Sequence, residues 1–203
     1  MLAALFVVIG YLSGSVTWGY WLVRAFRHED IRTQGSGNVG ATNVWRVHGR
    51  TLGLPAVVLD TAKGFVPVLI ATKVAGHGVG ALTGAAAMAG HWRPLFLKFQ
   101  KGGKMVATAG GSFLGLAPMV GGLGAGVWLL VFGLTRYASV ASILSAASLP
   151  LWSWLLGYPW PVTVFAGVAA LGVAVLHRAN VGRLWRGEEN RFTRTRAKPA
   201  ATP

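Results

Sequence analysis

The stretch GLAPMVGG, residues 115–122, interrupts the long apolar run that extends from Met105 to Leu134. A membrane-spanning helix needs about 20 apolar residues, with a range near 17–25. The run is therefore too long for one spanning helix and short for two. Because a proline such as Pro118 ends or kinks a helix, we predict two helices that meet at this residue.

Five further runs are apolar and long enough to cross or nearly cross a bilayer, namely Leu2–Val23, Leu52–Ala75, Val79–Trp92, Val140–Leu156 and Pro161–Leu176. The composition agrees with a membrane protein, since 53% of the 203 residues are apolar, only 12% are charged and 29 are glycine. A soluble surface requires far more charge. We therefore predict an all-α fold, an integral membrane bundle of seven transmembrane helices in one domain, residues 1–192. The first run lacks a basic start, so we expect a retained helix rather than a signal peptide.

Basic residues predict the orientation of this bundle. If the N-terminus lies outside, 17 of the 19 basic residues are cytoplasmic, while Lys73 faces outward and Lys63 lies within a span. Six spans would put either the basic C-terminal tail or the first two basic loops outside. The positive-inside rule therefore favours seven spans with the N-terminus outside and a cytoplasmic C-terminus.

The net charge of +14 has an ordinary explanation in this orientation. Residues 193–203 are expected to form a basic, disordered tail that is attracted to anionic lipid headgroups. No groove-reading or aromatic element accompanies the basic residues, so nucleic-acid binding is not expected.

The first inner loop contains GSGNVGATN, residues 35–43. Such a segment could be a flexible linker. However, glycines leave backbone N–H groups open to an anion, and here they alternate with hydroxyl and amide side chains. An arginine follows closely, and residues 41–49 fit a short interfacial helix. We favour an anion-binding loop with the polar residues Ser36, Asn38, Thr42, Asn43 and Arg46.

The second inner loop places Gly102 and Gly103 before Lys104, where the next apolar run begins. A glycine turn that leads into a helix presents free N–H groups and the positive end of the helix dipole. The loop is not a Walker A motif, because Lys98 and Met105 occupy positions that require Gly and Ser or Thr. A phosphate-binding turn and a plain basic turn remain open.

Two further inner segments carry polar residues at helical spacing. Ser139 and Ser142 can share a helix face, although serines also pack between membrane helices. His177 and Asn180 can share a face where the last span ends. A histidine there can exchange a proton near neutral pH, or simply lie at the interface as an amphipathic side chain.

Within the second span, Asp60 and Lys63 are spaced i, i+3, and we expect them to pair because isolated charges are costly there. Several catalytic signatures are missing. The sequence has no H-x4-D signature and no G-x-S-x-G elbow, and its five histidines lack metal-ligand spacing. We therefore expect neither a covalent serine nor a metal, and no cofactor.

The polar segments together indicate a phosphate-handling site at the inner membrane surface, where a soluble anion meets a lipid-soluble reactant. The alternative is a membrane transporter or channel for an organic phosphate anion, with the same basic residues and broken helices. No clear similarity between the two halves of the sequence supports that alternative.

Five segments carry a resemblance to a known family. DIRTQGSGNVGATNVWRVHG, LDTAKGFVPVLIA, GHWRPLFLKFQKGGKMVAT, RYASVASI and HRANVGRLWRGEENRF resemble, in order, the motifs of the bacterial acyl-phosphate:glycerol-3-phosphate acyltransferases, the PlsY family. The similarity extends from about YLSGSVTWGY to Phe192. It implies a seven-span enzyme that moves a fatty acyl group from acyl phosphate to the 1-hydroxyl of glycerol 3-phosphate, the first step of phospholipid synthesis. The products would be lysophosphatidic acid and phosphate.

By position, the resemblance implies one set of catalytic residues and one set that binds substrate or phosphate. The catalytic set is His177, Lys104, Ser142 and Asn180. The binding set is Ser36, Gly37, Asn38, Thr42, Asn43, Arg46, Gly102, Gly103 and Glu189. Two departures from the family pattern are the longer approach through Gln100–Lys101 and the presence of Met105 after the lysine. Implied partners are glycerol 3-phosphate, acyl phosphate, membrane lipids and a soluble acyl-phosphate-producing enzyme.

Overall fold

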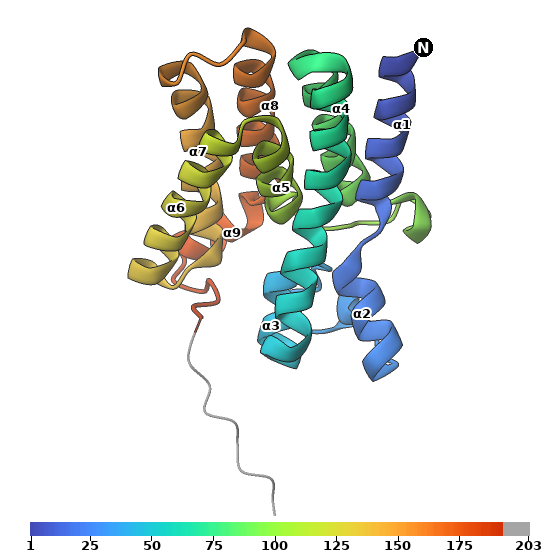
Figure 1. Ribbon diagram of the computed structural model, residues 1–203. Coiled ribbons are helices and arrows are strands. Elements are labelled where there is room, and N and C mark those ends of the chain that lie inside the picture. The colour runs from blue at the N-terminus through green and yellow to red at the C-terminus, as the bar shows by residue number, and fades with distance from the viewer. Residues whose placement is uncertain (193–203) are drawn as a thin grey trace, which may run out of the picture.

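The computed structural model describes residues 1–192, and the regular structure in this part of the chain is helical throughout. The predicted basic tail, residues 193–203, lies outside the described residues. Figure 1 shows the α-helices, which are α1 (Leu2–Ser15), α2 (Trp18–Arg27), α3 (Ala41–His48), α4 (Arg50–Trp92), α5 (Val106–Leu116), α6 (Pro118–Thr135), α7 (Ala138–Leu155), α8 (Trp160–Leu176) and α9 (Arg178–Trp185). Two short 3-10 helices, Ile31–Thr33 and Leu95–Leu97, lie in the connecting loops.

The lengths of the helices only partly settle how often the chain crosses a membrane. By length and composition, four helical stretches qualify as spans, and a fifth qualifies if α8 and α9, bent by 53°, form one broken span. The stretch Arg50–Leu97 is a single candidate by this test, although it folds back on itself, and α5 is a shorter apolar helix. The predicted segments thus form helices, with a break in the first one, while the seven-span count and the orientation of the termini stay predictions.

The first apolar run is not the single helix that we expected, because it breaks after Ser15. Val16 and Thr17 are non-helical, with ψ values of 99° and 89°. The buried pair Asp60–Lys63, joined at 2.8 Å as predicted, supplies partners at this break. Lys63 Nζ donates to the Val16 carbonyl at 2.7 Å, and the Trp18 amide donates to Asp60 at 3.4 Å. Backbone groups freed inside a membrane protein need such partners, so the break depends on residues 40 or more positions away.

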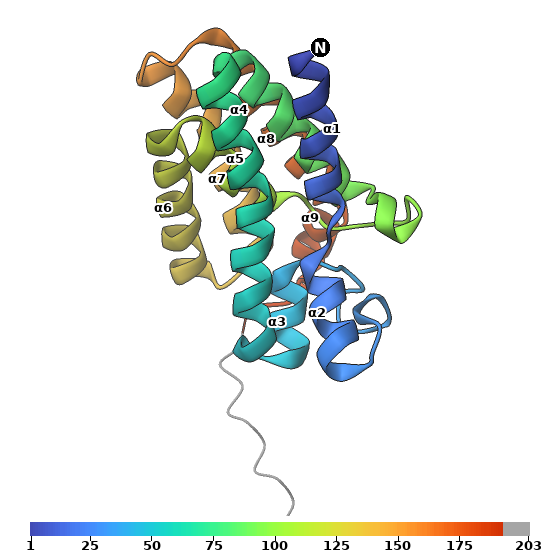
Figure 2. The same cartoon turned by 45° about the vertical axis from the view of Figure 1, so that its right-hand side comes forward.

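Helix α4 folds back at Gly76, whose φ of 81° and ψ of 174° are non-helical. A positive φ is easily adopted by glycine because it has no Cβ atom. Figure 2 shows the second arm leaving the top of the first arm and passing behind α1. The close contact between α1 and the second arm of α4 also requires glycine, since a Cβ atom on Gly14 would lie 2.0 Å from the Ala87 carbonyl oxygen.

The predicted break at Pro118 is confirmed. Ala117 leaves the helical region with φ −148° and ψ 81°, and Pro118 is the first residue of α6, where its missing N–H costs nothing. Next to this turn lies an apolar core of α4, α5, α7 and α8 residues in which Phe113 and Phe165 stack with ring centroids 4.8 Å apart. The core fixes the helices that form one wall of the candidate site.

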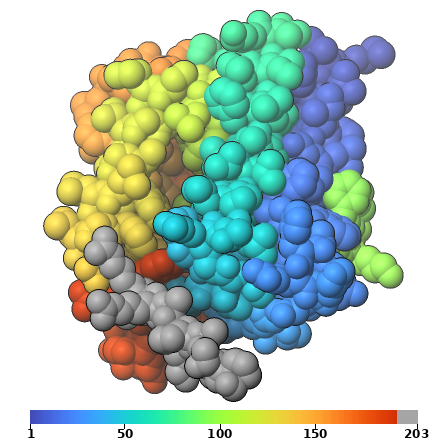
Figure 3. Space-filling view, turned by 60° about the horizontal axis from the view of Figure 1, so that its bottom comes forward, coloured from blue at the N-terminus to red at the C-terminus, as the bar shows by residue number. Residues whose placement is uncertain are grey.

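The polar segments gather at one end of the bundle, opposite the N-terminus, where α2, α3 and α9 lie (Figure 1). Figure 3 views this end and shows a hollow between the yellow surface of α6 and the turquoise surface of α3 and α4. The inner loops predicted from the sequence therefore meet around one recess.

Candidate active site

A cavity of about 610 Å³ lies within this recess. Its polar end is formed by the loop before α3, the turn before α5, the start of α7 and the α8–α9 junction. Its other end runs between α4, α5, α6 and α7. Ten of the predicted site residues line it: Ser36, Asn38, Thr42, Asn43, Arg46, Lys104, Ser142, His177, Asn180 and Glu189.

The three predicted glycines do not line the cavity, and their role differs from what we expected. The amides of Gly102 and Gly103 are not free, because they donate to the carbonyls of Trp92 and His91 at 2.9 and 3.0 Å. A Cβ atom on Gly103 would lie 1.9 Å from His91 Nε2, so this position has room only for glycine. The glycine turn therefore fixes the approach to Lys104 instead of offering its own amides. Gly37, with φ 67°, closes a turn in the first loop.

The first loop is an ordered structure and not a flexible linker. Asn43, which is 2% exposed, accepts from the Ser36 amide at 2.9 Å and donates to the Gln34 and Asn38 carbonyls at 3.0 and 2.9 Å. Asn38 also donates to the Gly102 carbonyl at 3.4 Å, which joins the first loop to the glycine turn. Asparagine suits this task because its amide both donates and accepts.

A hydrogen-bonded network connects the basic turn to the C-terminal segment. Lys104 Nζ donates to Asn180 Oδ1, and Asn180 Nδ2 donates to Glu189 at 2.6 Å. Glu189 also accepts from Ser139 at 2.9 Å and from Arg183 at 2.8 Å. Burial raises the pKa of Glu189, but these hydrogen bonds outweigh it and hold the pKa below its ordinary value. The Glu189 carboxylate is therefore ionised, and it orients Ser139, Asn180 and Arg183.

Positive charge dominates the polar end of the cavity. Four of the five acidic residues in the sequence form ion pairs, with Arg32, Lys63, Arg183 and Arg186, and the fifth, Glu29, lies 3.7 Å from His48. Within residues 1–192, Arg46 and Lys104 form no ion pair, and both line the cavity. Burial, reinforced by Arg183, lowers the pKa of Lys104 to about 8 although Glu189 opposes the shift. Two desolvated cations without counter-ions form a site for an anion.

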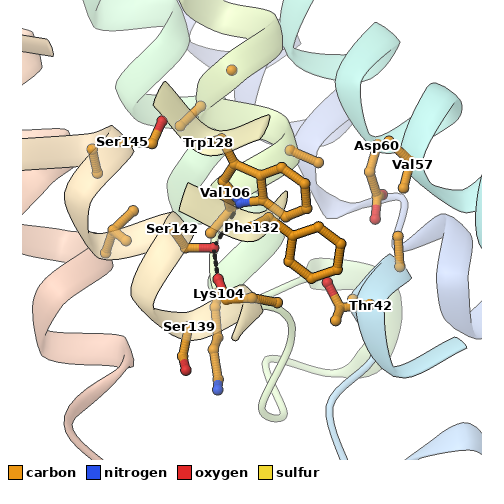
Figure 4. Close-up of a pocket in the computed structure, with 18 of the residues that line it drawn as sticks. Thr42, Val57, Asp60, Lys104, Val106, Trp128, Phe132, Ser139, Ser142 and Ser145 are labelled. Carbon is orange, nitrogen blue, oxygen red and sulfur yellow. Dashed lines mark hydrogen bonds between the residues drawn. The ribbon is translucent and has the colours of Figure 1, made fainter. Parts of the chain in front are cut away.

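His177 and Ser142 complete the polar wall. His177 is 4% exposed, and its Nδ1 lies 2.8 Å from the Val173 carbonyl. A carbonyl only accepts, so Nδ1 carries the proton and Nε2 is left as an acceptor in the neutral ring. Ser142 donates to the Ala138 carbonyl at 2.6 Å and accepts from Trp128 Nε1 at 3.1 Å. Figure 4 shows this indole contact above Lys104 and Ser139, with Thr42 on the opposite side.

Most of the remaining cavity wall is apolar and extends from the polar end into the bundle, along Val106, Phe113, Leu114, Trp128, Leu129, Phe132, Ala146 and Leu149. A largely apolar passage that begins beside Arg46 and Lys104 fits a molecule with an anionic head and an alkyl tail.

Sequence reasoning left several lining residues out of the site, among them Ser139, Arg183 and Trp128. Ser139 had been paired with Ser142 by spacing, and Arg183 had been counted only as an inner charge. Trp128 lies within an apolar run and gave no signal, because its role depends on α6 packing beside α7.

Comparisons with known proteins agree with this arrangement. The chain matches the family described as Glycerol-3-phosphate acyltransferase over residues 4–187. It is 48% identical over 192 residues to the glycerol-3-phosphate acyltransferase of Desulforudis audaxviator, covering 94% of this chain and 96% of the relative. It is 42% identical over 194 residues to that of Aquifex aeolicus, covering 95% and 100%.

Two solved structures share the fold. One is PlsY (YgiH), described as an integral membrane glycerol 3-phosphate acyltransferase in its glycerol 3-phosphate form, with a TM-score of 0.90 and 42% identity over 94% of this chain and 96% of that one. The other is its lysophosphatidic acid form, with a TM-score of 0.86, 42% identity and coverage of 94% and 95%. The family match, the relatives and the structures agree along nearly the whole chain, which therefore belongs to the PlsY family of glycerol-3-phosphate acyltransferases.

Proposed function

We propose that the protein transfers a fatty acyl group from acyl phosphate to the 1-hydroxyl of glycerol 3-phosphate, giving lysophosphatidic acid and inorganic phosphate. The observation that supports this reaction most directly is the continuity of the cavity. Arg46 and Lys104, which have no ion-pair partner among residues 1–192, line its polar end, and an apolar passage leads away from them. The head of each reactant is a phosphate, and only one reactant carries an alkyl chain.

The reaction requires two anions to meet, which bulk water opposes. The substrate hydroxyl oxygen attacks the acyl carbonyl carbon, the bond from that carbon to the phosphate oxygen breaks, and phosphate departs with the electron pair. Holding the reactants in place contributes about 7–11 kcal/mol in favourable cases. Cations aimed at the departing phosphate add to this, since removing one such donor typically costs about 2.7–4 kcal/mol.

The attacking hydroxyl must lose its proton, and two acceptors are compatible with the geometry. His177 Nε2 is one, because Nδ1 is engaged by Val173. A phosphate oxygen of the acyl donor is the other, since the donor already lies beside the hydroxyl. Either route leaves acyl transfer direct, without a covalent acyl-enzyme and without a cofactor.

The test is an assay of the purified protein with glycerol 3-phosphate and either palmitoyl phosphate or palmitoyl-CoA. We expect lysophosphatidic acid only from palmitoyl phosphate, with one phosphate released per acyl group transferred. Lys104→Ala should abolish most of this activity. Product from palmitoyl-CoA alone would overturn the donor assignment, and wild-type turnover by Lys104→Ala would overturn the phosphate assignment.

The same proposal places the site on the cytoplasmic face of a bacterial inner membrane, where glycerol 3-phosphate is dissolved. Acyl phosphate is a lipid-like anion made from soluble precursors, so a soluble enzyme is expected to supply it at this face. The positive-inside pattern of the sequence supports this orientation.

A further inference from the structure

A buried polar cluster inside the bundle lies behind the glycine turn. It consists of Asp60 and Lys63 on the first arm of α4 and His91 on the second arm, and these residues are 1%, 5% and 2% exposed. Lys63 Nζ lies 2.8 Å from Asp60 Oδ1, 2.7 Å from the Val16 carbonyl and 2.7 Å from His91 Nδ1. An ammonium group has three protons, and here it meets three acceptors.

The cluster fixes the state of the His91 ring. Because an ammonium only donates, His91 Nδ1 must accept, and the ring proton of the neutral imidazole lies on Nε2. The ring is therefore held in one orientation by Lys63, which is itself held by Asp60 and by the end of α1. Asp60 and His91 also line the cavity, so the cluster forms part of its wall.

His91 connects the cluster to the basic turn through two contacts. Its carbonyl accepts from the Gly103 amide at 3.0 Å. Its ring lies against the same residue, since a Cβ atom on Gly103 would lie 1.9 Å from Nε2. Lys104 is the next residue. A continuous path of contacts thus leads from the broken span through Lys63 and His91 to the cation that lines the polar end of the cavity.

We propose that Asp60, Lys63 and His91 act as positioning residues that set the place of Lys104 through the glycine turn. This inference rests on the proposed role of Lys104 in binding phosphate. The cluster contacts the glycine turn on the side away from Lys104. The Lys63–His91 hydrogen bond fixes the His91 ring, and the His91 ring and carbonyl in turn fix the position of Gly103 beside the cavity. Lys63 thereby helps to hold the Lys104 side chain in its place at the cavity wall.

A packing role and a positioning role make different predictions for substitutions at His91. His91→Asn keeps an acceptor near the position of Nδ1, whereas His91→Leu keeps apolar volume and loses the acceptor. If the ring only fills space, the two variants should behave alike. If the hydrogen bond to Lys63 positions the turn, His91→Asn should retain function and His91→Leu should lose it.

The experiment measures the dissociation constant of glycerol 3-phosphate with the full chain in detergent micelles. We expect His91→Leu to weaken binding about tenfold to a hundredfold, because small displacements of a binding group have effects of this size. His91→Asn should stay close to the wild type, and Ser153→Ala, at the far end of α7, serves as a control for a buried polar change. Thermal unfolding of each variant separates lost stability from lost binding.

A double-mutant cycle with Lys104→Met decides whether the cluster acts through Lys104. If it does, His91→Leu has little further effect once Lys104 is gone, so the two effects are strongly non-additive. Fully additive effects, or equal binding by His91→Leu and His91→Asn, would overturn the inference. If His91→Leu fails to fold, Asp60→Asn takes its place in the cycle, because it removes the charge that holds Lys63 and keeps the size of the side chain. A wild-type protein that does not bind glycerol 3-phosphate would instead overturn the proposed function.

Discussion

Asn180 donates a hydrogen bond from Nδ2 to Glu189 Oε1 at 2.6 Å, and this contact orients the amide group. The opposite end of the amide, Oδ1, then accepts from Lys104. Glu189 therefore acts on Lys104 through Asn180, although it also opposes the lowering of the Lys104 pKa as a charge. The same carboxylate holds Arg183, so one acidic residue arranges two cations around the cavity.

Glu189→Gln should damage substrate binding more than folding. The variant loses the negative charge that holds Arg183, and its amide oxygen accepts from Asn180 more weakly than the carboxylate does. A hydrogen bond to a charged group is typically worth about 1.5–3 kcal/mol, so we expect kcat/KM for glycerol 3-phosphate to fall roughly 10- to 100-fold. Steady-state kinetics with palmitoyl phosphate at saturation measures the effect.

The neighbouring residue provides a matched control. Glu188 pairs with Arg186, and both side chains are more than half exposed, so the pair should contribute little. Glu188→Gln makes the same chemical change one position away and should keep kcat/KM near the wild-type value. Equal losses in the two variants would argue against a specific role for Glu189.

The charge of Lys104 should make substrate binding depend on pH. Its pKa is lowered to about 8 by burial, so the side chain is charged below that pH and loses its proton above it. The phosphate of glycerol 3-phosphate remains a dianion over this range, so binding should weaken as pH rises. We expect the dissociation constant to increase about tenfold between roughly pH 7 and pH 9.5.

Lys104→Arg separates this effect from other titrations. A guanidinium stays protonated over the whole range, so the pH dependence should flatten whatever the affinity of the variant at neutral pH. Calorimetric titration of the purified protein at several pH values supplies the measurement. An unchanged pH dependence in Lys104→Arg would assign the titration to another group.

Local signals and the family resemblance predicted most of the helices and ten of the residues that line the candidate site. Pro118 marked the division between α5 and α6, and the spacing of Asp60 and Lys63 indicated their ion pair. Hydroxyl and amide residues in the first loop were singled out because they alternate with glycines and are followed by Arg46, a pattern that suits an anion. These features depend on residues close together in the sequence.

The features that the sequence did not reveal depend on contacts between distant segments. The break at Val16–Thr17 contains no proline, and its backbone groups are satisfied by Lys63 and Asp60 of another helix. The amides of Gly102 and Gly103 looked free because their acceptors, on residues 91 and 92, become available only when the turn folds back on α4. Arg183 enters the site because of the bend between α8 and α9.

The predicted orientation can be tested with single cysteines, because the natural sequence has none. Thr33 lies in the first inner loop and Lys73 near the outward end of the first arm of α4, and both are exposed. With a cytoplasmic site, a membrane-impermeant maleimide should label Lys73→Cys in right-side-out vesicles and Thr33→Cys only after the vesicles are opened. The reverse labelling pattern would place the N-terminus in the cytoplasm and the candidate site on the outer side of the membrane.

The apolar passage should limit the length of the acyl chain. Ala146 is 6% exposed and lines the passage between Ser142 and Leu149 on α7. Ala146→Leu adds three carbons to this wall and should exclude part of a long chain. Because each buried methylene contributes about 0.8 kcal/mol, we expect preference for palmitoyl over lauroyl phosphate to fall about tenfold. Ala147→Leu adds the same volume at an exposed position outside the cavity, and its preference should match the wild type.

Measurements of turnover, rather than of substrate binding, test the role of His177. Its Nδ1 is bound to the Val173 carbonyl, so Nε2 is the free acceptor of a ring that lines the cavity. If Nε2 removes the hydroxyl proton, His177→Gln should lower kcat by about 10²- to 10⁴-fold, the usual contribution of general base catalysis. The dissociation constant of glycerol 3-phosphate should change little, because Arg46 and Lys104 remain. Single-turnover measurements with palmitoyl phosphate isolate the chemical step.

We expect this large loss of kcat in His177→Gln, since a neutral imidazole in this geometry is already prepared to accept a proton. Near-normal turnover by His177→Gln would instead assign the proton to a phosphate oxygen of the acyl donor and leave His177 a structural role at the α8–α9 junction.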